Sequence, residues 1–131
     1  MLILNKKTKE ELITYFKSKI PYEACGLLAS EKNNGINIFY PIPNISSYPK
    51  KHFKFDPQIY IQSLHDIENK NLHLIGVIHS HPTTNAFPSK MDVDHWHYPD
   101  LSYWIYSLPD DQLNAFFIQN QQVIILNWAK G

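Results

Sequence analysis

The stretch Leu74-Ile75-Gly76-Val77-Ile78-His79-Ser80-His81-Pro82 joins a buried strand to a candidate metal site. Its first five residues are an apolar run with β-branched side chains, which indicates a buried β-strand. His79 and His81 stand at the exit of that strand and point to the same side, because side chains alternate along a strand. Ser89 and Asp92 follow after a short loop. Two imidazoles, the Asp92 carboxylate and one open position are typical of a catalytic zinc site rather than a structural one.

A pair of histidines one residue apart is a weak signal by itself. With seven histidines in 131 residues, such a pair is expected about 0.4 times by chance, and a second pair is present at His95 and His97. Requiring the serine and the aspartate at their positions lowers the expected number to roughly 0.0015. We therefore favour the first pair together with Asp92 as metal ligands, over Asp94 and over the second pair.

The size and charge of the chain favour one ordinary globular domain. The 131 residues are enough for a hydrophobic core, and 44% hydrophobic with 18% charged residues is a common balance. Twelve basic and twelve acidic residues give a formal net charge of zero, so nothing indicates a nucleic-acid or membrane partner selected by charge.

The lack of a signal-peptide pattern and the presence of a single cysteine favour a cytoplasmic protein. The segment Met1–Lys7 lacks the apolar core of a signal peptide, and no apolar stretch approaches the length of a membrane span. The single cysteine, Cys25, excludes an internal disulfide. It also excludes an all-thiolate zinc site and the Cys-x-x-Cys site of nucleobase deaminases.

The pattern along the chain predicts mixed α and β structure, with strands dominating the second half. Three helices are expected: from a capping box at Thr8-Lys9-Glu10-Glu11 to Pro21, from Asp56-Pro57 to about Asn71, and from Ser89 to about Tyr98. Besides the histidine-bearing strand, strands are expected over Cys25–Ser30, Ile36–Ile42, Phe53–Phe55, Ser102–Leu108, Leu113–Ile118 and Val123–Trp128. Asn33-Asn34-Gly35 predicts a hairpin turn.

A catalytic zinc site of this kind is typical of a hydrolase in which a metal-bound water attacks the substrate. Such a hydrolase needs a carboxylate that accepts the proton of the attacking water. Four of the five glutamates lie on predicted helix faces or beside a turn and are explained as solvated charges. Glu23 differs because it lies between helix and strand, beside an apolar run. Chemistry alone leaves a structural and a functional role for Glu23 equally open.

Two further side chains have alternative interpretations. Ser89 is a candidate nucleophile, helix cap or hydrogen-bond donor. A metal-bound hydroxide makes a serine nucleophile unnecessary, so the donor role toward an oxyanion is preferred. Cys25 has no histidine near it in sequence and is interpreted as a buried strand residue rather than a thiol nucleophile.

Taken together, Glu23, His79-Ser80-His81, Ser89 and Asp92 resemble the JAMM motif of MPN-domain metalloproteases. The segment Pro21–Leu28 is also similar to the one that carries the catalytic glutamate in that family, and the resemblance extends over about residues 8 to 128. It implies an α/β, deaminase-like MPN fold with a curved mixed sheet flanked by helices.

The resemblance also implies roles for these residues. Glu23 is the general acid and base, His79, His81 and Asp92 bind one zinc ion per chain, and Ser89 stabilises the oxyanion. The implied reaction is hydrolysis of the bond after the C-terminal glycine of a ubiquitin-like or sulfur-carrier protein. The implied partner is therefore a protein of this class with a C-terminal Gly-Gly tail. A non-catalytic MPN scaffold and a zinc hydrolase of a small amide metabolite remain as alternatives.

Overall fold

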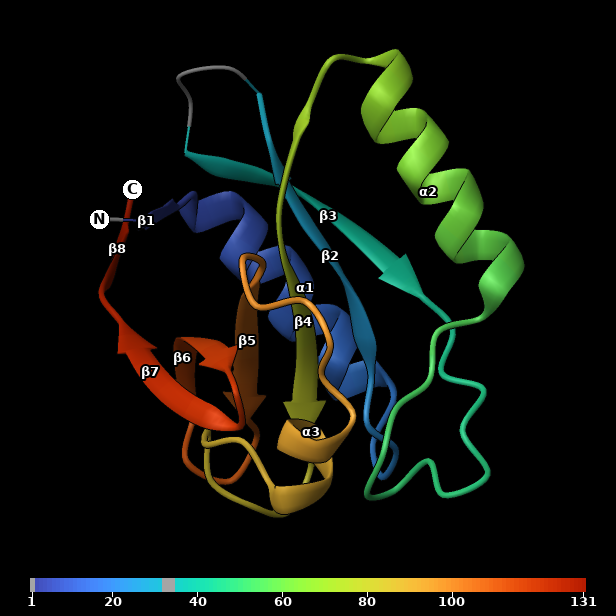
Figure 1. Cartoon of the computed structure of the whole chain (residues 1–131), viewed down its shortest axis with the longest axis vertical. Coiled ribbons are helices and arrows are strands. Elements are labelled where there is room, and N and C mark those ends of the chain that lie inside the picture. Colours follow the sequence, from blue (N-terminus) through green and yellow to red (C-terminus); the bar gives the residue numbers. More distant parts are fainter. Residues whose placement is uncertain (1, 32–34) are drawn as a thin grey trace.

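In the computed structural model, residues 2–31 and 35–131 are described, and they form an α/β structure in which three helices flank one mixed sheet (Figure 1). The helices are α1 (Lys6–Ser18), α2 (Pro57–Asn69) and α3 (Lys90–Asp94). The strands are β1 (Leu2–Leu4), β2 (Cys25–Ser30), β3 (Ile36–Ile42), β4 (His73–His81), β5 (Ser102–Ser107), β6 (Gln112–Gln119), β7 (Gln122–Leu126) and β8 (Trp128–Lys130). No helix among the described residues is long and apolar enough to cross a membrane.

The order of the strands requires a curved sheet. Within the described residues the order is β7-β6-β5-β4-β2-β3-β1-β8, and β4 is antiparallel to β2 but parallel to β5. β7 and β8 lie at opposite ends of this order although only Asn127 separates them in sequence. Because Asn127 alone connects these two strands, the sheet must curl until the two ends of the order approach each other. The predicted fold class, a curved mixed sheet flanked by helices, is confirmed.

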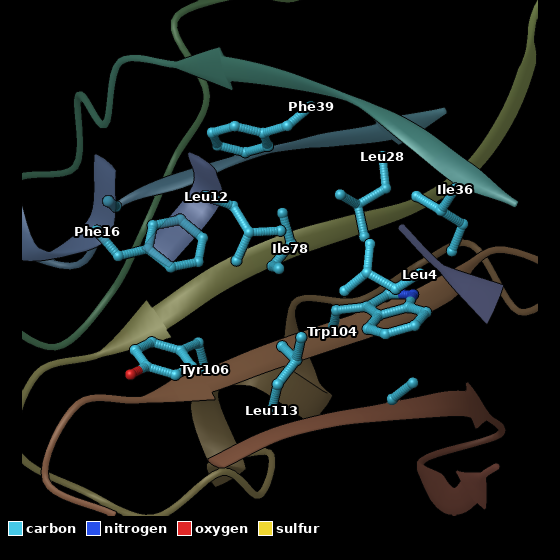
Figure 2. Close-up of a cluster of buried hydrophobic side chains, with 12 residues drawn as sticks. Leu4, Leu12, Phe16, Leu28, Ile36, Phe39, Ile78, Trp104, Tyr106 and Leu113 are labelled. Atoms are coloured by element: carbon cyan, nitrogen blue, oxygen red, sulfur yellow. The ribbon is translucent and has the colours of Figure 1, made fainter. Parts of the chain in front are cut away.

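Alternation along β4 assigns its side chains to two separate cores. Ile78 packs in one core with Leu12 and Phe16 of α1, and Figure 2 shows these three side chains close together. The neighbouring Val77 packs in the other core, which also contains Ile67 of α2. The two helices therefore cover opposite faces of the sheet, and residues 77, 79 and 81 all face away from α1.

The predicted helices are present, with corrected ends. α1 begins after Asn5, whose side chain accepts from the N–H of Lys7 at 2.9 Å, so the predicted capping box at Thr8 is wrong. Thr8 is instead a buried residue of the first helical turns. α2 has the predicted cap at Asp56, and α3 is capped by Ser89 but is shorter than predicted.

The predicted strands are largely confirmed, with three differences. The Phe53–Phe55 strand is wrong, since only an isolated bridge joins Phe55 to Asn44. The predicted strand Val123–Trp128 divides at Asn127 into β7 and β8, and β1 was not predicted. Asn33 and Asn34 of the predicted turn lie outside the described residues.

Candidate metal centre

The two histidines of the motif converge at the end of β4. Their side chains are 0% and 3% exposed, and the Nε2 atoms of His79 and His81 lie 3.0 Å apart. α3 brings Asp92 to the same point, near the end of β4 (Figure 1). Its carboxylate oxygens lie 3.4 Å from Nε2 of His79 and 3.1 Å from Nε2 of His81. Among the described residues this is the one group of three side chains spaced to hold a metal ion.

A hydrogen bond on the far side of His81 determines which ring nitrogen is free. Nδ1 of His81 lies 2.7 Å from the carbonyl oxygen of Asn85. Because a carbonyl only accepts, Nδ1 must carry the proton, and Nε2 of the neutral ring presents a lone pair. That lone pair faces a carboxylate oxygen of Asp92. Two acceptors at this distance repel unless a proton or a metal ion lies between them.

The pKa shifts of His81 and Asp92 also indicate that positive charge is stabilised between them. Burial alone would lower the pKa of His81, but hydrogen bonds to Asp92 and Asn85 and the nearby negative charges raise it. Burial alone would raise the pKa of Asp92, but attraction to His79 and hydrogen bonds from both histidines and from the Ser89 N–H hold it well below its ordinary range. A set of two imidazoles and one ionised carboxylate therefore fits a metal cation such as zinc.

Packing fixes the ring plane of His79. The ring stacks on Phe53 with centroids 4.5 Å apart and planes 27° apart, and the ring of Tyr103 lies 5.2 Å away. Its Nδ1 atom is buried without a hydrogen-bond partner among the described residues. Apolar contacts thus orient this imidazole, whereas a hydrogen bond orients His81.

The alternative ligands do not join this group. Asp94 is exposed and its carboxylate accepts a hydrogen bond from Lys90. His95 points Nδ1 at the carbonyl of Met91, and His97 is exposed. These three side chains lie outside the group that His79, His81 and Asp92 form.

Glu23 is the one buried glutamate of the five. Its Oε1 atom lies 3.9 Å from Nε2 of His79 and has no hydrogen-bond partner among the described residues. Burial is the largest effect on its pKa, which is raised even though His79 and His81 act to lower it. The residue precedes β2, in which Cys25 lies opposite His79. The antiparallel pairing of β2 with β4 therefore brings this carboxyl to the candidate metal ligands.

Two polar residues to which the motif analysis gave no role hold the Glu23 segment in place. The buried Ser80 accepts from the Ala24 N–H at 2.9 Å, on the face of β4 opposite the histidines. The Asn44 amide donates to the carbonyls of Glu23 and His52. It also accepts from two backbone N–H groups, those of Ser46 and Lys54. A serine between two histidines on a buried strand was a usable signal, whereas Asn44 acts through contacts that a sequence does not show.

We predict that Asn44→Ala lowers the free energy of unfolding by about 2–3 kcal/mol, because four hydrogen-bonding groups lose their partner together. Asn37→Ala is the matched control, since Asn37 accepts one hydrogen bond, from the Glu31 N–H. Its expected cost is about 1 kcal/mol or less. Urea unfolding of the two variants checks this, and equal losses would contradict the role given to Asn44.

Ser89 caps α3 through a reciprocal pair of hydrogen bonds with Asp92. Its Oγ accepts from the Asp92 N–H at 3.0 Å, and Asp92 accepts from the Ser89 N–H at 2.9 Å, which completes a capping box. The hydroxyl hydrogen of Ser89 stays available for donation.

Cys25 is a buried residue of β2, as predicted, and burial raises the pKa of its thiol.

Comparisons with known proteins agree with this architecture. The chain is 30% identical over 96 residues to the desampylase of Haloferax volcanii, which covers 72% of this chain and 68% of that protein. It is 29% identical over 119 residues to a probable TtuB-protein conjugate cleaving protease of Thermus thermophilus, covering 89% and 76%.

Solved structures show the same fold. A protein from Desulfitobacterium hafniense superposes with a TM-score of 0.89 at 31% identity, covering 100% of this chain and 93% of that one. A JAB1/MPN domain protein from Archaeoglobus fulgidus superposes with a TM-score of 0.66 at 17% identity, covering 99% and 98%. The family described as prokaryotic homologs of the JAB domain matches residues 5–119. The chain therefore belongs to the prokaryotic JAB family, within the JAMM/MPN group that its motif resembles.

Proposed function

We propose that this protein is a zinc-dependent isopeptidase or peptidase that hydrolyses the bond after the C-terminal glycine of a ubiquitin-like or sulfur-carrier protein. In this proposal residues 1–131 act as one metalloprotease domain with one zinc ion. The observation that carries the proposal is the buried convergence of His79, His81 and Asp92, with the Glu23 carboxyl 3.9 Å from His79. The Oε1 atom of this carboxyl has no hydrogen-bond partner among the described residues, so it does not orient a ligand as a purely structural carboxylate would.

In the proposed reaction, the candidate ligands, Glu23 and Ser89 have separate roles. When bound by the two histidines and Asp92, zinc supplies Lewis acidity, which polarises a carbonyl and acidifies a water molecule. Glu23 takes a proton from the attacking water while the new C–O bond forms, and the C–N bond then breaks. Glu23 returns that proton to the departing amine. The Ser89 hydroxyl donates to the oxygen that gains negative charge at the scissile carbonyl.

The substrate class is supported by the relatives and by the chemistry of a glycine tail. The Thermus relative is named for cleaving protein conjugates of TtuB, and the Haloferax relative is a desampylase. A glycine tail has no side chains that would clash with a buried metal centre. Such a tail also binds in extended form through backbone hydrogen bonds.

A substrate panel tests this function. The three substrates are a ubiquitin-like protein joined through Gly-Gly to a lysine side chain, the same protein carrying a single amino acid after Gly-Gly, and a set of small amides. We expect cleavage after the second glycine in the first or second substrate, identified by product mass. Turnover of the small amides alone would favour the metabolite alternative. No turnover with metal bound would favour the scaffold alternative.

We predict that Ser89→Ala retains the metal and lowers kcat by about 10²–10³-fold, because one donor to the developing oxyanion is lost. Loss of the cap costs about 1 kcal/mol of stability, so rates must be compared well below the unfolding temperature. Mass spectrometry of a slow reaction with the wild-type protein should show no acyl adduct. A stable adduct on Ser89 would contradict direct attack by water.

A further inference from the structure

A cavity of about 200 Å³ opens beside the metal centre, on the side of Asp92. We infer that this cavity binds a large, uncharged apolar side chain of the substrate on the acyl side of the scissile bond. This inference rests on the proposed function, and it adds a specificity that the metal ligands and Glu23 do not determine.

The size and lining of the cavity fit one bulky apolar group. A cavity of about 150 Å³ with an apolar lining is large enough to bind benzene, and this one is larger. Six aromatic side chains line it: Phe53, Phe55, Tyr60, Trp96, Tyr98 and Tyr103. An aromatic or branched aliphatic side chain would therefore be in contact with rings on several sides.

The cavity is continuous with the reacting centre. Asp92 lines it directly, and two of its aromatic rings, Phe53 and Tyr103, also contact the His79 ring. A side chain bound there would lie next to the metal ligands. Since the proposed tail ends in Gly-Gly, this side chain would belong to the residue that precedes the two glycines.

The lining favours an uncharged occupant. Besides its tyrosines, its titratable side chains are His52, His95 and Asp92, and the Asp92 carboxylate belongs to the candidate metal centre. A lysine or arginine would be buried there without a free acidic partner, and an acid would exchange its hydration for a lining in which six aromatic rings outnumber the two imidazoles. The indole N–H of Trp96 is buried with no acceptor among the described residues. A peptide carbonyl attached to the bound side chain is the kind of acceptor that this N–H lacks.

The position of Glu23 assigns the cavity to the acyl side. Glu23 must come within hydrogen-bond reach of the leaving amine to protonate it. It does not line the aromatic cavity but a separate one of about 330 Å³, together with Tyr22 and Pro43. The leaving group therefore faces that second cavity, which leaves the aromatic cavity to the acyl chain.

Binding to the cavity is measurable without metal or turnover. The chain has three tryptophans, and Trp96→Phe identifies the indole N–H signal of Trp96 in an NMR spectrum. The purified protein is titrated with N-acetylphenylalaninamide, N-acetylglycinamide and N-acetylglutamate amide. We expect a saturable shift of the Trp96 signal with the phenylalanine compound, at an affinity about 10- to 100-fold higher than with the other two.

Leu101→Trp is the blocking variant, because Leu101 lines the cavity and is only partly buried. Ile125→Trp is the matched control, since it adds the same ring at a 70% exposed position of β7. We expect the first variant to abolish the preference for phenylalanine and the second to retain it. Equal shifts with all three compounds, or no saturable shift, would overturn the inference while leaving the metal content and the proposed function untouched.

Peptide amides of the form X-Gly-Gly, each joined to a fluorescent amine, test the acyl side. With wild-type protein, phenylalanine at X should give at least a tenfold higher kcat/KM than glutamate or glycine at X, and Leu101→Trp should remove the difference. A flat series in an active enzyme that binds N-acetylphenylalaninamide would overturn the acyl-side assignment. Inactivity toward every peptide would count against the proposed function instead.

Discussion

Replacing Glu23 with glutamine should leave the fold and the metal content intact and lower kcat by about 10²–10⁴-fold. Glutamine has nearly the same shape but cannot take up the proton of the attacking water, and a positioned acid–base group contributes about this factor. The variant should be at least as stable as the wild type. The reason is that Glu23 is 5% exposed and its Oε1 atom has no hydrogen-bond partner among the described residues, so the charged form is costly to bury.

Steady-state kinetics and metal analysis of the same preparation check this expectation. Glu68→Gln is the matched control, because Glu68 is exposed on α2 and its substitution should leave kcat unchanged. If Glu23→Gln retains near wild-type activity, a different group accepts the proton, and the role assigned to Glu23 is wrong.

His79→Ala and Asp92→Asn should each lose the metal, the second largest effect we expect. Two remaining side chains are too few to hold zinc in a site that keeps an open position. The amide introduced by Asp92→Asn would keep an oxygen that can accept from the Ser89 N–H, which in the wild type donates to Asp92 at 2.9 Å. This second variant therefore separates metal loss from loss of the helix cap.

Metal content by mass spectrometry is the direct measurement, and thermal unfolding with and without added zinc is the second. Zinc should raise the unfolding temperature of the wild type, since a ligand that binds only the folded state stabilises it. It should leave that of His79→Ala unchanged. His95→Ala and His97→Ala serve as controls and should keep full metal content. Full metal content in both ligand variants would place the site elsewhere.

The parts of the fold that follow from local patterns were predictable, and the parts that depend on distant partners were not. The apolar run before His79 identified β4, and Asp56 before Pro57 identified the start of α2. β1 has three residues and exists because it pairs with β3 and β8. Phe53 is an aromatic residue of the kind that is common in strands, yet its ring packs on His79 and its backbone belongs to no strand of the sheet.

The candidate site follows the same division. Alternation along a strand placed His79 and His81 on one face, and the cap at Ser89 placed Asp92 in the first turn of α3. Glu23 was ambiguous from chemistry alone, because its proximity to His79 depends on the pairing of β2 with β4. The aromatic cavity is lined by side chains from the 52–60 segment and the 91–103 segment, together with Val77 of β4. No local pattern indicates that these two segments meet.

The most direct test of the account is the rate of cleavage of a Gly-Gly isopeptide conjugate before chelation, after chelation and after zinc is restored. Metal content is measured on the same samples. We predict that cleavage after the terminal glycine disappears when the metal is removed and returns with one zinc ion per chain. Cleavage that continues unchanged in protein shown to be free of metal would contradict the account.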